Sequence, residues 1–355
     1  MKTIKWKLAL LSTLTVALLT ACGGGSPGDQ KLRIEYSSLV SFGDSLSDVG
    51  TYQVGGIIAM GGGQYTVNSA TAKNWTQLLA AQMGLPAPCP AQKGLDGNAS
   101  YGLSVPVVNT AACLNYAQGG SRVTNPVGPG NKLLGGSNAI LGQLTVPIST
   151  QINTHLTKVG GRFSGTEMVT VMAGANDVFI NLTMVGMGAM SAPSAVTAMG
   201  TAGAELAAYI KTMVIDKGAS KVLVLNVPDV KGTPFGMAQS PEVQGLIDLM
   251  VTTFNTQLKT GLQNTSGVLI VDAYTASKDE TANPAQYGIS NATTPACLMD
   301  PSKNALGTSL VCNSSNVVAG DVSKYLFADS VHPTPYGQQL IAQLVAKELV
   351  LAKWF

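Results

Sequence analysis

A serine near the start of the chain and a histidine near its end are the residues of this sequence best suited to nucleophilic chemistry. Ser45 lies in Gly43-Asp44-Ser45-Leu46-Ser47-Asp48, and His332 follows Asp329 by three residues. A neutral imidazole takes a proton from a serine hydroxyl most readily when a carboxylate holds its other nitrogen and stabilises the imidazolium that forms. One turn of chain can supply both Asp329 and His332. We therefore interpret Ser45 as nucleophile, His332 as general base and Asp329 as the acid that orients the base.

Each member of this set has a simpler structural alternative. Ser45 follows a short apolar run, so its hydroxyl could merely cap a helix that begins just after it. The chain has only one other histidine, His155, within Gln151 to Leu156. That segment has the pattern of an amphipathic helix, so His155 is interpreted as a helix-face residue. A mechanism that depends on histidine therefore favours His332.

Attack on a carbonyl also requires hydrogen-bond donors for the oxyanion that develops, each worth roughly 3 kcal/mol. Two glycine-containing segments follow predicted strands, namely Asn115 to Ser121 and Met172 to Asp177. The first can offer glycine N–H groups, which approach a ligand closely because they carry no Cβ. The second offers the side-chain amide of Asn176. Taken alone, each segment is equally well explained as a simple turn.

Taken in chain order, the segments around Ser45, Gly120, Asn176 and His332 resemble the blocks of the GDSL (SGNH) family of serine esterases and lipases. The matching residues are Gly43-Asp44-Ser45-Leu46, Gly120, Asn176 in Gly-x-Asn-Asp, and Asp329-x-x-His332-Pro333. With Asn226-Val227-Pro228-Asp229, the wider match resembles the secreted bacterial esterase and phospholipase branch and spans roughly residues 37 to 353. The resemblance implies an oxyanion hole made by the N–H groups of Ser45 and Gly120 and by Asn176.

The same resemblance implies a flavodoxin-like α/β/α sandwich of three layers that needs neither cofactor nor metal. Its substrates would be short acyl esters, lipids or acylated sugars, cleaved through an acyl-enzyme on Ser45. Gly119 stays an alternative to Gly120 as the backbone donor. Asp48 is expected to hold the Ser45 turn by hydrogen bonds, and Asp44 either does the same or approaches the histidine. Neither is the expected acid of the triad.

Short apolar runs and longer helical patterns alternate along the chain from residue 35 to residue 355. Buried strands are predicted at Leu39 to Phe42, Leu114 to Ala117, Met168 to Ala173, Val222 to Val227 and Val268 to Asp272. Helices are predicted at Ala72 to Met83, Ile140 to Val159, Ala192 to Asp216, Pro241 to Leu262 and Pro335 to Lys353. This alternation predicts one domain with a mainly parallel five-stranded sheet covered by helices on both faces. Such sheets carry their sites at the carboxyl ends of the strands, where Ser45 lies.

Three long segments without clear periodicity are expected to be functional loops. They span Thr51 to Lys73, Ala87 to Ala112 and Tyr274 to Tyr325. Their sequences are individual, so they leave the acyl chain and the alcohol of the substrate open.

Residues 1–21 have the features of an export signal, with three lysines followed by an apolar run. Leu19-Thr20-Ala21-Cys22 resembles a bacterial lipobox, which predicts a lipid on Cys22 and a flexible linker over residues 22–34. The residue after Cys22 is glycine, which favours the outer membrane, on its periplasmic or its outer side. The alternative is an ordinary secretory signal with an incidental cysteine.

The other four cysteines are expected to pair locally in an oxidising compartment, Cys89 with Cys113 and Cys297 with Cys312. Two further pairings are possible for four cysteines. A zinc site is disfavoured because the chain has no Cys-x-x-Cys spacing and only two histidines.

The composition indicates a globular protein, since 45% of the residues are hydrophobic and 11% are charged. Three of the 21 basic residues lie in residues 1–21, so 18 basic residues face 19 acidic ones after cleavage. This balance gives no support to a nucleic-acid partner. Besides ester hydrolysis, the same groups could serve a phospholipase or an acyltransferase. A surface lipoprotein that only binds a partner is the less favoured alternative, and the sequence does not indicate an oligomeric state.

Overall fold

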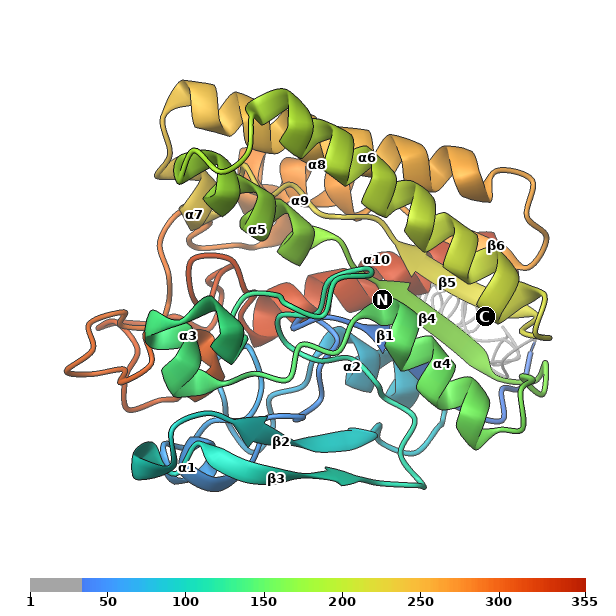
Figure 1. Cartoon of the computed structure of the whole chain (residues 1–355), viewed down its shortest axis with the longest axis horizontal. Helices are drawn as coiled ribbons and strands as arrows, with labels where there is room; N and C mark the ends of the chain where they lie inside the picture. Colours follow the sequence, from blue (N-terminus) through green and yellow to red (C-terminus); the bar gives the residue numbers. More distant parts are fainter. Residues whose placement is uncertain (1–33) are drawn as a thin grey trace, which may run out of the picture. The chain divides into compact units, whose positions relative to one another are not determined.

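Four parallel strands form the central sheet of the computed structural model, which describes residues 34–355 (Figure 1). They are β1 (Leu39–Gly43), β4 (Met168–Met172), β5 (Lys221–Leu225) and β6 (Val268–Val271), hydrogen-bonded in the order β1-β4-β5-β6. All three ladders are parallel and in continuous register. The predicted signal peptide 1–21, the lipidation site Cys22 and nearly all of the linker 22–34 lie outside the described residues.

The fifth predicted strand, Leu114 to Ala117, is not a strand, and the prediction of a five-stranded sheet is wrong. The segment does lie beside β1, where Ser41 N donates to Leu114 O at 3.0 Å and Tyr116 N donates to Ser41 O at 2.8 Å. The next pairing is incomplete, because Gln118 N donates to Gly43 O at 3.1 Å but Gly43 N donates to the Gln151 side chain at 2.9 Å. The segment is thereby reduced to isolated bridges at the edge of the sheet beside β1.

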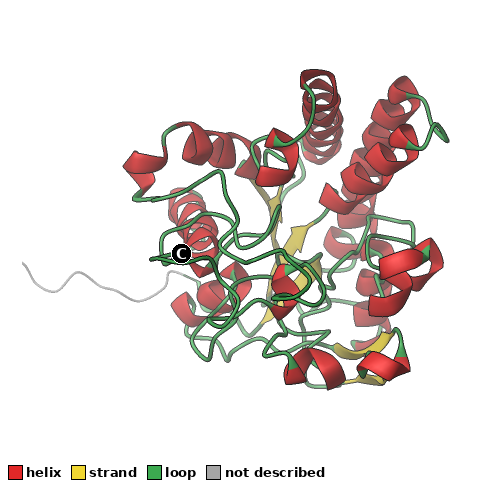
Figure 2. Cartoon of the chain, turned by 90° about the vertical axis from the view of Figure 1, so that its left-hand side faces the viewer, coloured by secondary structure: helices red, strands yellow, loops and turns green. Residues whose placement is uncertain are grey.

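Helices cover both faces of this sheet (Figures 1 and 2). Their bounds are α1 Gly55–Ala59, α2 Trp75–Gln82, α3 Gly136–Leu141, α4 Ile148–Lys158, α5 Ala175–Gly186, α6 Ala192–Tyr209, α7 Pro234–Met237, α8 Pro241–Leu262, α9 Ala273–Ala282 and α10 Pro335–Leu351. Alternate strand residues such as Val40 and Phe42 belong to the core cluster that contains α4, α6 and α8. The residues between them face the opposite side of the sheet. On that side α2 is tied to α10, because Trp75 N donates to the Gln338 side chain at 2.9 Å.

Two predicted helices differ from the observed ones, and glycine and proline explain the first difference. The segment predicted as one helix from Ile140 to Val159 is two, because Gly142 adopts a positive φ of 63° at the end of α3 and Pro147 precedes α4. The predicted helix from Ala192 to Asp216 is α6 followed by a π-helical turn over Ile210–Ile215. No helix of residues 34–355 is long and apolar enough to cross a membrane.

All three segments expected to be loops contain regular structure, and the first of them, residues 51–73, contains the short helix α1. An antiparallel hairpin, β2 (Gln92–Asp96) and β3 (Ser104–Asn109), occupies most of residues 87–112. Helix α9 begins the segment from residue 274 to residue 325. Neither was predicted, because β3 is almost wholly exposed and α9 carries few apolar residues, so both lack the apolar periodicity that marks an element.

Candidate active site

Ser45 is the second residue of the turn that follows β1, at the edge of the sheet where the carboxyl ends of the parallel strands lie. Gly43 makes this turn possible, because a Cβ there would lie 3.0 Å from both Met172 O and the Ser47 side chain. Leu46 N donates to the Asp44 carboxylate at 3.1 Å, and Ser47 N donates to Asp44 O at 3.1 Å. The chain then continues as turns, so the alternative of a helix beginning after Ser45 is not observed. Ser45 therefore has no helix to cap.

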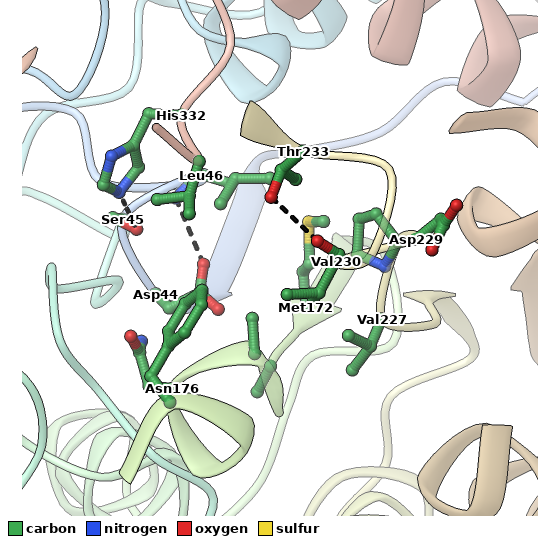
Figure 3. A pocket seen from close by; sticks show the side chains of 15 residues that line it. Asp44, Ser45, Leu46, Met172, Asn176, Val227, Asp229, Val230, Thr233 and His332 are labelled. Atoms are coloured by element: carbon green, nitrogen blue, oxygen red, sulfur yellow. Dashed lines mark hydrogen bonds between the residues drawn. The ribbon is translucent and has the colours of Figure 1, made fainter. Parts of the chain in front are cut away.

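His332 lies between Ser45 and Asp329 and is hydrogen-bonded to both. Its Nε2 is 2.9 Å from Ser45 Oγ (Figure 3), and its Nδ1 is 2.7 Å from Asp329 Oδ2. Asp329 also accepts hydrogen bonds from the N–H groups of Val331, His332 and Ser309 at 2.8 to 2.9 Å. Burial by itself raises the pKa of Asp329, but the His332 charge and these donors outweigh it and hold that pKa well below its usual range. An ionised carboxylate thus fixes the ring with Nε2 directed at the serine.

The imidazole is further held by an aromatic neighbour, Tyr65. The two ring centroids are 4.8 Å apart with an interplanar angle of 32°. The buried Tyr65 hydroxyl is hydrogen-bonded to the Gln143 amide, and in the orientation that satisfies both amide atoms Gln143 N donates to Gly119 O at 3.2 Å. One buried network therefore links the wall beside His332 to the glycine segment.

The backbone around Gly119 and Gly120 is clamped on two sides. Gly119 N donates to Asp48 Oδ2 at 3.0 Å, and Tyr52 Oη donates to Gly119 O at 2.8 Å. Gly119 C=O and Gly120 N–H belong to one trans peptide and point in opposite directions. The Gly120 N–H is directed away from Tyr52 and has no hydrogen-bond partner within residues 34–355. Of the two candidate glycines, only Gly120 therefore has an N–H that can serve a ligand.

Asn176 lies in the first turn of α5 and brings its amide to the same place. Its Nδ2 donates to Ser121 O at 2.8 Å, which engages one of its two amide hydrogens. The neighbouring Asp177 binds Arg122 Nε at 2.9 Å and Val123 N at 3.1 Å. The start of α5 thus fastens the segment that follows Gly120 and leaves one Asn176 hydrogen for a ligand.

The two acidic residues near Ser45 hold backbone. Asp48 accepts from Gly50 N and Thr51 N at 2.8 and 2.7 Å in addition to Gly119 N, and burial raises its pKa to about 6 against these donors. Burial likewise raises the pKa of Asp44 to about 7, although the Leu46 N–H and the His332 charge both lower it. The side-chain hydrogen bond of Asp44 goes to Leu46, and none joins it to His332.

Two cavities meet at Ser45 and His332 and differ in character. The inner cavity is lined mainly by apolar side chains such as Met172, Val227 and Val230, with Asp44 and Asp229 among its polar residues (Figure 3). The outer cavity is the larger of the two and combines apolar residues with more polar groups, among them Gly120 and Gln143. Within residues 34–355, no group of three His, Cys, Asp or Glu side chains is arranged to hold a metal ion. The two cavities can therefore give an ester carbonyl placed at Ser45 different surroundings on its acyl side and on its alcohol side.

Residues 39–345 match the family described as GDSL-like lipase/acylhydrolase, a family of ester hydrolases. The chain belongs to this family.

The similar proteins align with very different shares of this chain. A GDSL esterase/lipase of Arabidopsis thaliana is 33% identical over 96 residues, which are 27% of this chain and 25% of the plant protein. An uncharacterized protein in the trpE-trpG intergenic region of Pseudomonas putida is 28% identical over 371 residues, covering 97% of this chain and 52% of that protein. The GDSL-like chain thus spans about half, or less, of the length of these curated relatives.

Solved structures with similar backbones include esterases and lipases. A catalytic mutant of an acetylxylan esterase from Geobacillus stearothermophilus has a TM-score of 0.41 and 13% identity, covering 90% of this chain and 96% of that one. Phospholipase A1 from Streptomyces albidoflavus has a TM-score of 0.40 and 14% identity, covering 88% of this chain and 99% of that one.

The GDSL-like chain contains the two local disulfides that its cysteine spacing predicts, Cys89–Cys113 and Cys297–Cys312. Disulfides are typical of the periplasm and the extracellular medium. The second disulfide lies beside the site, since Cys297 N donates to Ala328 O at 2.8 Å and Cys312 N donates to Ser309 O at 3.0 Å. It therefore closes the loop that supplies the Ser309 N–H to Asp329.

His155 is remote from this chemistry and is more deeply buried than a helix-face residue. Its Nδ1 is 3.1 Å from the Tyr116 hydroxyl, and its ring packs against Phe42 and Phe163. Burial lowers the pKa of His155 to about 4, with a smaller contribution from the charge of Lys158. His155 is thus a neutral core residue of α4.

Proposed function

We propose that this protein hydrolyses carboxylic esters through an acyl-enzyme on Ser45. The observation that carries the proposal is the hydrogen-bonded series Asp329, His332 and Ser45 beside an unpaired Gly120 N–H. Ser45 Oγ attacks the carbonyl carbon while its proton passes to His332 Nε2, and Asp329 stabilises the imidazolium. The N–H groups of Ser45 and Gly120 and the Asn176 amide hold the oxyanion.

Collapse of the tetrahedral intermediate breaks the bond to the alcohol oxygen, which receives the proton from His332. Water then attacks the acyl-enzyme, giving one proton to His332 as its oxygen bonds to the carbonyl carbon. The second collapse releases the carboxylic acid and returns that proton to Ser45 Oγ. The net reaction consumes one ester and one water and forms one acid and one alcohol.

Each of the two cavities suits a different part of the ester. Apolar walls suit the acyl group, so the inner cavity takes it, and the larger polar outer cavity takes the alcohol. Short acyl esters of bulky polar alcohols, including acylated sugars and lipid head groups, fit this division. Transfer of the acyl group to another alcohol, as in an acyltransferase, would use the same intermediate, and analysis of products formed with added glycerol separates the two outcomes. A binding lipoprotein without chemistry is less favoured, because binding alone requires no Ser45–His332 contact.

For the cellular location, we propose an outer-membrane protein held by a lipid on Cys22, on either side of that membrane, with secretion as the alternative. The two disulfides favour an oxidising compartment. Mass spectrometry of Cys22 in the exported protein tests the anchor, and an unmodified cysteine would support secretion.

Labelling by a fluorophosphonate probe tests the nucleophile. The wild-type protein is expected to react and to hydrolyse p-nitrophenyl acetate, whereas Ser45→Ala loses both properties. Ser137→Ala provides the control, because Ser137 lines the outer cavity and makes no hydrogen bond to His332. Full turnover by Ser45→Ala would refute the proposal.

A further inference from the structure

We propose that a third cavity, the rear cavity behind the inner one, binds the far end of the acyl group, and that Glu280 in it hydrogen-bonds a hydroxyl carried by that chain. The rear cavity lies between α9, α10 and the loops 228–233 and 326–333. The inference rests on the proposed acyl-enzyme at Ser45 and names hydroxylated acyl esters as a substrate class.

The rear and inner cavities share a wall. Leu46, Met172 and Val331 line both of them, and so does the start of the loop after β5. Leu46 directly follows Ser45, so a chain esterified to the serine meets this wall first. Met172 is unbranched and flexible, which makes it a side chain that an entering chain can displace. An acyl chain that outgrows the inner cavity is therefore led into the rear one.

Most of the rear cavity is apolar, as a hydrocarbon chain requires. Helix α9 contributes Ala273 and Ala276, and helix α10 contributes Ile341 and Leu344. The alanines recur at helical spacing and leave room along α9 where larger side chains would fill it. The walls therefore accept methylene groups up to the point where Glu280 lies, one turn beyond Ala276.

Glu280 is the exception in this lining. It is 8% exposed, and it makes no hydrogen bond or ion pair with any residue of 34–355. Its polar neighbours are engaged elsewhere, because Ser277 Oγ accepts from Asp229 N at 2.8 Å and Thr281 Oγ1 donates to Ser277 O at 3.1 Å. Within residues 34–355 the Glu280 carboxyl therefore has no protein partner, and a polar group bound in the cavity can take that place.

The surroundings of Glu280 select a neutral partner. Burial raises the pKa of Glu280 to about 7, with a further contribution from Asp279. Asp229 also lines the cavity, so an anionic chain end would be repelled. A carboxyl group that is partly protonated at neutral pH can donate to a hydroxyl and also accept from it. A hydroxyl on the acyl chain meets these conditions.

The experiment compares p-nitrophenyl esters of unsubstituted acids with their terminally hydroxylated counterparts over a series of chain lengths, using the full chain. Acetate, which is too short to pass the shared wall, is the reference substrate. The variants are Glu280→Leu, Glu280→Gln and Ala276→Phe, and the control is Glu35→Leu at an exposed glutamate. Melting temperatures are measured alongside, and Glu280→Leu is expected to melt no lower than the wild type.

The wild type is expected to favour the hydroxylated ester in kcat/KM at one or more chain lengths. Glu280→Leu loses about tenfold of that preference, because a site built for a hydroxyl discriminates through its polar group. Glu280→Gln keeps most of the preference, and Ala276→Phe loses the longer esters of both kinds. Acetate turnover stays within about twofold in every variant.

An unchanged hydroxyl preference in Glu280→Leu, or a parallel fall for acetate, would overturn the assignment of the rear cavity. If Glu280→Leu does not fold, unchanged turnover of long esters by Ala276→Phe overturns it instead. Failure of the proposed function looks different, since the wild type would then not hydrolyse acetate at all, or Ser45→Ala would hydrolyse it as fast.

Discussion

Replacing Tyr52 by phenylalanine tests whether the Gly120 N–H must be held in place. The change removes the hydroxyl that donates to Gly119 O at 2.8 Å and accepts from Thr145 N at 3.3 Å, and it leaves the ring. Complete loss of an oxyanion donor reduces kcat by about a hundredfold or more. Here the donor is still present and Gln143 still donates to Gly119 O, so the peptide is loosened and not released. We therefore expect kcat to fall about tenfold, equivalent to about 1.4 kcal/mol.

The assay measures kcat and KM for p-nitrophenyl acetate together with the free energy of unfolding. A lost buried hydrogen bond costs about 1 to 2 kcal/mol of stability, so stability alone cannot distinguish a catalytic effect from a structural one. Tyr36→Phe is the matched control, because the Tyr36 hydroxyl donates to the Trp354 carbonyl at 2.8 Å, away from the site. Tyr52→Phe should lower kcat at nearly constant KM, and Tyr36→Phe should lower stability only. Equal kcat values in the two variants would refute the role given to Tyr52.

Three further perturbations have defined outcomes. Asp329→Asn should lower kcat by about 10⁴-fold, because an amide favours the wrong imidazole tautomer, and activity near the wild-type level would contradict the triad. Lowering the pH from 7 to 5 should reduce stability by about 2 kcal/mol through His155: its pKa is 6.5 when unfolded and about 4 when folded, so the unfolded state takes up the proton first. Urea unfolding checks this, and His155→Phe should lose that share of the pH dependence. Replacing both Cys297 and Cys312 by serine should cost about 3 kcal/mol for a closed loop of about 15 residues. It should also lower kcat through the Ser309 contact to Asp329, and unchanged kcat would show that the loop holds its place without the crosslink.

The parts of the fold that the sequence predicts are those determined locally. Asp329 and His332 come from one turn, so their spacing was informative, and the four regular strands are short, mostly apolar runs rich in valine and bounded by turn residues. Residues 114–117 have the same apolar appearance, but the Gln151 side chain, distant in the sequence, takes the Gly43 N–H that would continue the pairing with β1. The turn after Ser45 resembled a helix start because a serine after a strand suits both structures.

The supporting residues could not be predicted, because their roles depend on contacts between distant segments. Tyr52 and Tyr65 lie in a stretch without periodicity, and nothing in their local sequence indicates Gly119 or His332 as neighbours. Gln143 follows the glycine that ends α3 and would ordinarily be assigned to solvent. The burial of Glu280 was equally hidden, since a glutamate on a polar helix is normally exposed.

The Asp48 carboxylate joins two segments that are far apart in the sequence, since it binds the backbone of Gly50 and Thr51 with one oxygen and that of Gly119 with the other. The turn that carries the proposed nucleophile and the proposed oxyanion donor Gly120 are thereby fixed to each other directly and not through the chain between them. Within that intervening chain, the exposed hairpin of β2 and β3 contributes none of these contacts, so it can change in length or sequence without altering the distance between Ser45 and Gly120. Natural or engineered diversity in substrate choice can therefore accumulate there while the reaction geometry is preserved.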